Sequence, residues 1–410
     1  MRCTPAVLAG TVLTFVASAI NSSDVFAATR YVGRNGACAN HSTIGTAFVS
    51  CADSRTAGCT AAKPCCTFQD GSNAAKADGD VIEVHDGTYT DATGYTDSTG
   101  SYAFLNAKAS VRLNTAGVTL KRAAGDTPTL DLGTTNDLGV LAVADRITVD
   151  GLRFIGGLGG TDNTRSGHVY AAQTSDVKIR NNVFEVGTTN HVESVSGSMC
   201  VMLKNSINFL IEDNTCSGGW DFSFWVYSTS RGGGGVVRRN AQIGNGRGGV
   251  GPQRGMMFEL LGSRGDNGVL LIYGNTLEQA PSSETTWGFY LREIHWKVYL
   301  FNNIIRGVNG TGVYFQDDLC SGSPEHYHSE QWNIFNNTFI AKSSGADTGI
   351  RWPGCVEGKV TNNIFSGFNS GTEMKGGCPV QICDTRDDAL RSTVNASFTY
   401  NLCHLHSSCA

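Results

Sequence analysis

One short pattern recurs nine times after residue 146 and limits the possible folds more than any other feature. Each copy has alternating apolar residues, a pair of residues that ends in Asn (Gly in the first copy), and another apolar residue. The markers follow one another at irregular steps of 26 to 38 residues: Gly151, Asn182, Asn214, Asn240, Asn275, Asn303, Asn337, Asn363 and Asn401. An irregular period near thirty is the signature of a solenoid.

Each copy has a direct physical interpretation. Period-two alternation over a few residues indicates a short strand with one buried face, and Asn tolerates the left-handed backbone that a sharp corner requires. Asn side chains stacked from coil to coil can bond to one another and satisfy buried amides. A propeller needs four strands in every 40 to 50 residues, so the period is too short for it. We therefore predict an all-β right-handed parallel β-helix.

The N-terminal residues predict an export signal. Arg2 precedes an apolar stretch over 6–20, and Val25 and Ala27 are small residues at the spacing a signal peptidase requires. We expect residues 1–27 to be a signal peptide and 28–410 a single β-helix domain. No later apolar run is long enough to cross a membrane, so we expect no membrane partner. The expected location is extracellular or periplasmic.

Composition limits the partners. A formal net charge of −5 with 16% charged residues argues against nucleic acid, which needs a clustered basic face. The 51 Gly suit a β-rich chain with tight turns. We expect a monomer.

The cysteines predict disulfide-rich ends. Of 14 Cys, Cys3 lies in the signal, which leaves an odd number, so one thiol stays unpaired. In an exported chain, close sequence pairs favour disulfides in an N-terminal and a C-terminal cap. A zinc site is the weaker alternative, because no typical ligand spacing is present. The close groups are Cys38, Cys51, Cys59, Cys65 and Cys66, then Cys378 with Cys383, and Cys403 with Cys409.

The start of the mature chain resembles the pectate-lyase-like β-helix superfamily. The resemblance rests on four segments: residues 31–36 (YVGRNG), 64–69 (PCCTFQ), 79–84 (GDVIEV) and 86–89 (DGTY). It implies a short helix over 67–77 that caps the open first coil, where strand edges and core would otherwise be exposed. It also implies that glycans bind along one sheet and its flanking loops.

The strands of that sheet are expected before each Asn turn, over 169–173, 201–204, 222–227, 256–260, 289–292, 313–316 and 350–352. Alternation places one set of side chains on the outer face, where aromatic rings and charges suit the flat faces and hydroxyls of sugars. The set is Lys204, Trp225, Tyr227, Glu259, Tyr290, Arg292, Tyr314, Gln316 and Arg351. Adjacent coils lie about 4.8 Å apart, so Glu259, Tyr290, Arg292, Tyr314 and Gln316 can converge, whereas Lys204 and Arg292 lie about 14 Å apart.

A polar insertion over 317–328 follows these residues and is expected to fold over the groove. His326 and His328 titrate near neutrality, and Asp317 and Asp318 are candidate calcium ligands. Cys320 is expected to anchor the insertion, with Cys355 as its candidate partner.

The resemblance implies a polysaccharide lyase that cleaves an acidic, uronate-containing substrate by β-elimination. That reaction needs a cation beside the carboxylate, a base for the C5 proton and an acid for the leaving oxygen. The candidate cation is Arg292 or calcium. The candidates for the base and the acid are Tyr290, Tyr314, His328 or Lys204. Glu259 is assigned to the catalytic set, and Lys204, Trp225, Tyr227, Gln316, Arg351 and His326 to substrate binding.

Two alternatives stay open. In an inverting glycoside hydrolase, Glu259 and Asp317 would form the acid and base pair, about 9.6 Å apart by backbone spacing. In a non-catalytic glycan-binding adhesin, the same rings and charges would bind sugar without a poised acid and base.

Overall fold

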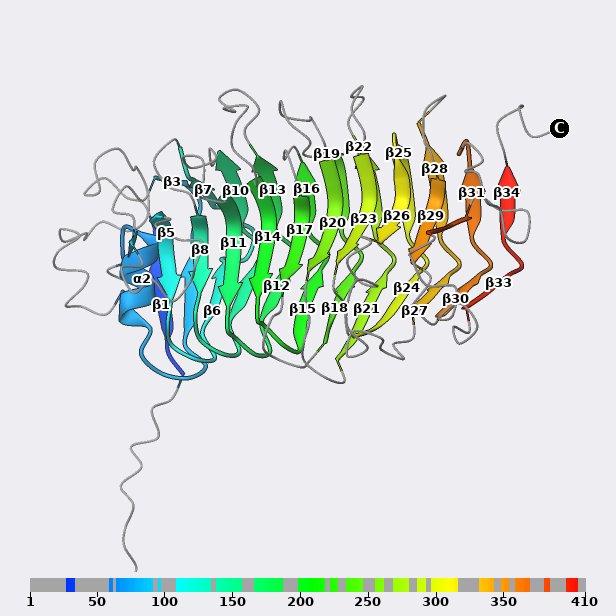
Figure 1. The fold of residues 1–410 in the computed structure, drawn as a ribbon. Coiled ribbons are helices and arrows are strands. Elements are labelled where there is room, and N and C mark those ends of the chain that lie inside the picture. Colours follow the sequence, from blue (N-terminus) through cyan, green and yellow to red (C-terminus); the bar gives the residue numbers. More distant parts are fainter. Residues whose placement is uncertain are drawn as a thin grey trace, which may run out of the picture.

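The structure is a computed structural model. It describes residues 27–33, 59–61, 64–90, 95–96, 108–133, 138–156, 166–186, 198–217, 222–227, 234–245, 255–261, 268–279, 286–292, 296–315, 332–342, 348–353, 358–368, 380–383 and 396–404. These residues wind as the predicted right-handed parallel β-helix, with three long sheets that run side by side along the axis (Figure 1).

Sheet 1 contains the strands that enter the Asn turns. Its order is β1 (Thr29–Val32), β2 (Val81–Val84), β6 (Thr119–Arg122), β9 (Thr148–Asp150), β12 (Lys178–Arg180), β15 (Phe209–Glu212), β18 (Gly235–Arg238), β21 (Val269–Tyr273), β24 (Lys297–Phe301), β27 (Trp332–Phe335), β30 (Gly358–Thr361) and β33 (Ala396–Thr399).

Sheet 2 contains the strands that leave those turns. Its order is β3 (Thr88–Tyr89), β7 (Thr129–Asp131), β10 (Arg153–Gly156), β13 (Val183–Val186), β16 (Thr215–Ser217), β19 (Ala241–Asn245), β22 (Thr276–Gln279), β25 (Ile304–Val308), β28 (Thr338–Ala341), β31 (Ile364–Ser366) and β34 (Leu402–His404).

Sheet 3 completes each coil and is the sheet expected to carry the groove. In chain order its strands are β4 (Tyr95–Thr96), β5 (Lys108–Leu113), β8 (Leu138–Ala142), β11 (Ser166–Ala172), β14 (Ser198–Lys204), β17 (Phe222–Tyr227), β20 (Gly255–Leu261), β23 (Thr286–Arg292), β26 (Thr311–Phe315), β29 (Thr348–Pro353) and β32 (Val380–Cys383). Apart from the antiparallel β4–β5 pair, the strand pairs described are parallel.

The stacked Asn side chains form a continuous ladder between sheets 1 and 2. Asn275, for example, donates from Nδ2 to Oδ1 of Asn303 at 2.9 Å and accepts from Nδ2 of Asn240 at 3.0 Å. Its Oδ1 also accepts from the backbone N–H of Asn240 at 3.0 Å. The same bonds link the Asn markers in turn from Asn182 to Asn401. The predicted ladder is therefore confirmed.

The left-handed residue of each turn precedes the ladder Asn. Asn181, Asn302 and Asn336 have φ between 55° and 57°, while the ladder Asn of each pair does not appear among the positive-φ residues. Gly151 is also left-handed, with φ 75°. The next residue, Leu152, donates its backbone N–H to Oδ1 of Asn182, the first Asn of the ladder. The expected left-handed residue is therefore present in these turns, and it is the neighbour of the ladder Asn that adopts this backbone.

A short helix lies within the range predicted for the capping helix, but over fewer residues than 67–77. Helix α2 spans Phe68–Ala74, and the Thr67 side chain accepts from the N–H of Asp70 at its start. Figure 1 shows α2 at the N-terminal end of the solenoid, beside β1 and β5. A Cβ on Gly71 would lie 2.6 Å from the Val32 side chain, so the glycine permits this close approach.

Two disulfides lie within the described residues. Cys59–Cys65 is at the N-terminal end, within the group of cysteines expected to form that cap. Cys200–Cys216 joins β14 of sheet 3 to β16 of sheet 2 inside the solenoid, a link that the sequence interpretation did not anticipate. Cys66, next to the first bridge, is also disulfide-bonded. The partner of Cys66 and the pairings of the other cysteines lie outside the described side chains. Both bridges fit an oxidising environment.

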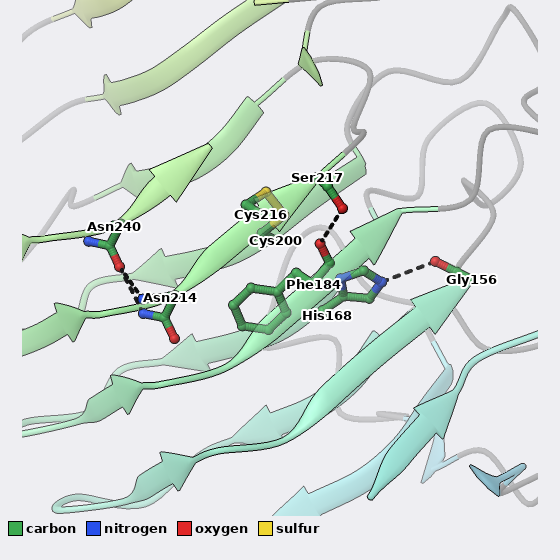
Figure 2. The surroundings of a disulfide bond; sticks show 8 residues. All are labelled: Gly156, His168, Phe184, Cys200, Asn214, Cys216, Ser217 and Asn240. Atoms are coloured by element: carbon green, nitrogen blue, oxygen red, sulfur yellow. Dashed lines mark hydrogen bonds between the residues drawn. A yellow bond between two sulfur atoms is a disulfide. The ribbon is translucent and has the colours of Figure 1, made fainter. Parts of the chain in front are cut away.

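The interior beside this bridge contains a buried histidine. His168 is 2% exposed and stacks on Phe154 and Phe184. Its Nε2 shares a 3.0 Å hydrogen bond with the Gly156 carbonyl, and Figure 2 shows this bond and the Phe184 ring beside the imidazole. Its Nδ1 has no hydrogen-bond partner among the described residues. Burial lowers the pKa of the imidazole from 6.5 to about 4, despite opposing effects of the Gly156 carbonyl and Glu185.

We expect Asn275→Leu to destabilise the protein by about 3 kcal/mol or more, because it leaves buried donors and acceptors on neighbouring coils unpaired. Thermal unfolding followed by circular dichroism measures the effect. The control is Asn302→Gly, which changes the exposed left-handed residue of the next turn and should leave the melting temperature nearly unchanged. Equal melting temperatures for the two variants would contradict the role assigned to the ladder.

We expect His168 to make the protein less stable as the pH falls from about 6.5 to about 4. In this window the unfolded chain binds a proton at His168 that the folded chain excludes, so the free energy of unfolding falls by up to about 1.4 kcal/mol per pH unit. His168→Gln should flatten this dependence by about one proton. Phe184→Leu is the control, since it perturbs the same cluster without changing a titrating group. Identical slopes in wild type and His168→Gln would refute the assignment.

Candidate functional site on sheet 3

The outer residues of sheet 3 align in rows, as expected. Strand register pairs Glu259 with Tyr290, Tyr290 with Tyr314, and Tyr314 with Arg351. Three of the residues expected to converge therefore lie on successive strands, and Arg351 follows on the next. We call this set the central row; towards the N-terminus it continues through Trp225 and Met202.

A second row lies two residues further along each strand. It runs from Lys204 through Tyr227 and Leu261 to Arg292. Arg292 is thus opposite Leu261 rather than Glu259. Lys204 and Arg292 are three strands apart, in agreement with the expected separation of about 14 Å.

Four side chains of the central row and its border form a compact group, which we call the aromatic–arginine cluster. The Trp287 ring stacks on Tyr314 with centroids 4.3 Å apart and on Tyr290 at 4.9 Å. The Tyr290 and Tyr314 rings lie 5.6 Å apart and nearly parallel. Arg351 donates from Nη1 to the Tyr314 hydroxyl at 2.9 Å, and its Cζ lies 4.9 Å from the centre of that ring.

The cluster combines apolar and charged character at one place. Trp287 is 5% exposed, whereas Tyr290, Tyr314 and Arg351 are only partly buried. The hydrogen bond to Tyr314 and the ring beneath it orient the guanidinium, which limits the side-chain entropy lost when it binds an anion. Ring edges, hydroxyls and a fixed cation can together contact an acidic sugar.

Sequence reasoning missed Trp287, because a bend interrupts the alternation of sheet 3. In β23, Gly288 and Phe289 both face the interior, where a Cβ on Gly288 would lie 2.9 Å from Ile305. Trp287 and Tyr290, three positions apart, therefore lie on the same outer face. The same doubled inward position occurs at residues 139–140, 168–169, 200–201 and 312–313. A recurrent Gly followed by an apolar residue was the available signal.

The N-terminal part of the outer face is buried. Tyr170, Met202 and Trp225 are each at most 1% exposed and form an apolar cluster with Trp287, against which Tyr290 and Tyr314 pack. Lys204 is 8% exposed. Trp225 and Lys204, expected to bind substrate, are therefore buried in this structure and do not present an open surface.

The other predicted residues cannot be placed to the same degree. Gln316, Asp317, Asp318, His326 and His328 lie outside the described residues, as do Cys320 and Cys355. The strand positions of Tyr227, Glu259 and Arg292 are described, but their side chains are not. Their roles stay predictions.

The described residues were also compared with the requirements of a metal site and of a membrane-spanning helix. No group of three or more His, Cys, Asp or Glu side chains that could hold a metal ion occurs among them. Within the same ranges, no helix has the length and hydrophobicity needed to cross a membrane.

Three parallel sheets wound around one apolar core define this protein as a parallel β-helix. No known protein-family profile matches the chain, and no curated protein matches it. Solved structures that resemble it include the A-module of a mannuronan C-5 epimerase from Azotobacter vinelandii, with 13% identity, 82% of this chain and 96% of that chain covered, and a TM-score of 0.45.

Two further solved structures show weaker likeness. A pectate lyase has 15% identity, coverage of 78% of either chain and a TM-score of 0.38. A mutant tailspike protein of an E. coli bacteriophage, in complex with a pentasaccharide, has 12% identity and a TM-score of 0.40. The alignment to the tailspike covers 80% of this chain but only 60% of the tailspike.

We expect Trp287→Ala to destabilise the protein by about 3 kcal/mol, because it removes a buried ring that contacts two others. Tyr290→Ala should cost less, since its ring is partly exposed. Urea unfolding followed by circular dichroism compares the two variants. A smaller loss for Trp287→Ala than for Tyr290→Ala would show that the tryptophan does not support the cluster.

Proposed function

We propose that this protein is an exported enzyme that degrades an acidic polysaccharide, and that it acts as a lyase on uronate units at the C-terminal half of sheet 3. The aromatic–arginine cluster carries the proposal. It places a positioned guanidinium and two phenols on the outer face, next to the strand position of Arg292. Such a set matches a sugar ring that bears a carboxylate.

The reaction would proceed by β-elimination. A base removes the C5 proton, the electron pair forms the C4–C5 double bond, and the bond from C4 to the glycosidic oxygen breaks as that oxygen takes a proton. Arg292 and Arg351 are suited to the carboxylates of neighbouring units, because a guanidinium binds a carboxylate in bidentate fashion. The proton transfers fall to Tyr290, Tyr314 and His328.

Calcium is the alternative to Arg292 as the cation beside the substrate carboxylate in this scheme. The described residues offer no cluster of oxygen ligands for it. Asp317 and Asp318 stay its proposed ligands, with Glu259 on β20, two strands from β26 in sheet 3. Assays with a chelator and with added calcium decide whether the ion contributes.

Export is supported by the two disulfides, since both are stable in an oxidising compartment. The Cys200–Cys216 bridge lies within the solenoid core rather than at an exposed edge. At this buried position the bridge would serve stability rather than redox exchange.

The decisive experiment incubates the purified protein with polygalacturonate, alginate and chondroitin. Ultraviolet absorbance measures the unsaturated product, and a reducing-end assay counts chain breaks. Absorbance and reducing ends that rise together support the lyase. Reducing ends alone identify a hydrolase, and retained glycan binding with neither signal identifies a binder; each of these overturns the proposal.

We expect Arg292→Ala and Arg351→Ala to lower kcat/KM at least tenfold, equivalent to about 1.4 kcal/mol of transition-state stabilisation, without unfolding the protein. Arg351→Lys should recover only part of the loss, because it keeps the charge but not the planar geometry. Arg306→Ala is the matched control, an exposed arginine on sheet 2. Unchanged turnover in both sheet 3 variants would remove the site from this face.

A further inference from the structure

The first strand of the solenoid is preceded by a residue held through both of its peptide groups. The N–H of Ala28 donates to Oδ1 of Asp80 at 2.7 Å, and its carbonyl accepts from the N–H of Val81 at 2.9 Å. Thr29 then begins β1 and pairs with Val81. Ala27, the residue before, is exposed. Ala28 is therefore attached to the first coil through both its N–H and its carbonyl.

Asp80 is an unusual partner for a backbone N–H, because its side chain is fully buried. Its Oδ2 accepts from the N–H groups of Lys76 and Ala77 at 2.9 and 3.1 Å, and lies 3.7 Å from the Arg30 guanidinium. Burial alone would raise the pKa of this carboxyl. The backbone hydrogen bonds and Arg30 outweigh burial and hold the pKa below its ordinary value, so the group is charged.

We propose that the Ala27–Ala28 peptide bond is hydrolysed during export and that the new α-ammonium group of Ala28 forms a buried ion pair with Asp80. A leader peptidase would supply the catalyst and water the co-reactant. The water oxygen bonds to the carbonyl carbon of Ala27 as the C–N bond breaks. Ala27 departs as a carboxylate with the leader, and the Ala28 nitrogen takes up protons to become an ammonium.

Two independent observations meet at this bond. Val25 and Ala27 provide the small residues that a signal peptidase requires on the leader side. On the other side, the Ala28 nitrogen already lies 2.7 Å from a buried carboxylate, closer than the 3.7 Å of Arg30. Cleavage there converts a neutral donor into a cation at the same place. Processing after another residue would put the charge elsewhere.

The ion pair would fasten the N-terminal end of the solenoid after export. Asp80 connects Ala28 to the segment that follows α2, so the new charge strengthens the junction between the cap and the first coil. Among the described residues, the other charged groups of this corner are Arg30 and Lys76, together with Asp78, which pairs with Arg146. An α-amino group is protonated below about pH 8, so the stabilisation is complete at neutral pH and is lost in strongly alkaline solution.

The test uses the full chain expressed in a secreting host. Mass spectrometry of the secreted protein should show Ala28 as its first residue. A variant with Gly-Ser inserted after Ala27 keeps the cleavage site but moves the new amine two residues from Asp80. We expect its melting temperature at pH 7 to be about 2 °C lower or more. The gap should close at pH 10.5.

Variants of the acid separate the ion pair from other effects of the insertion. In Asp80→Asn, the Gly-Ser insertion should no longer change the melting temperature. In Asp78→Asn, the exposed acid of the same turn, the full difference should persist. If Asp80→Asn does not fold, the pH dependence of the first pair decides alone. Secreted protein that begins at another residue, or a gap that is the same at pH 7 and pH 10.5, overturns the proposal.

Discussion

The Asn ladder between sheets 1 and 2 is the interaction on which the other features depend. Each ladder side chain satisfies the backbone N–H of the preceding coil and donates to the side chain of the next one, as Asn275 does with Asn240 and Asn303. Such buried groups are costly when unpaired, so a coil cannot slip by one residue without breaking several bonds. Loops between strands can therefore vary in length while the coils remain in register.

Fixed register has a direct consequence for the outer face of sheet 3. Residues about thirty positions apart become neighbours at strand spacing, which brings Tyr290, Tyr314 and Arg351 together from three separate segments. None of these residues is close to the others in sequence. The site is therefore a product of the repeat, and a residue's contribution depends on its row as much as on its chemistry.

The fold was predictable because its signals are local and repeated. The Asn markers and the strand alternation each occur in short segments, so every coil provides an independent test. The site was predictable only in part, since alternation gives the direction of a side chain but not what covers it. Trp225 points outward as expected and is nevertheless 1% exposed. Trp287 was missed because the bend at Gly288 reverses the alternation, and Cys200–Cys216 because its partners lie on different sheets.

The doubled inward position of sheet 3 also shows how one sheet can have an apolar, buried outer face at one end and an aromatic, charged one at the other. Inward residues there are small where the opposite core residue is large: Gly288 faces Ile305, and Gly312 faces Phe339. Further towards the N-terminus, the same position is occupied by His168, which burial keeps in its neutral form, and by Cys200, which forms a disulfide. Core volume is thus balanced at the coils that contain Gly288 and Gly312. The outer side chains can therefore differ along the sheet, from apolar residues at Met202 and Trp225 to rings and charge at Tyr314 and Arg351. The register that aligns them stays the same.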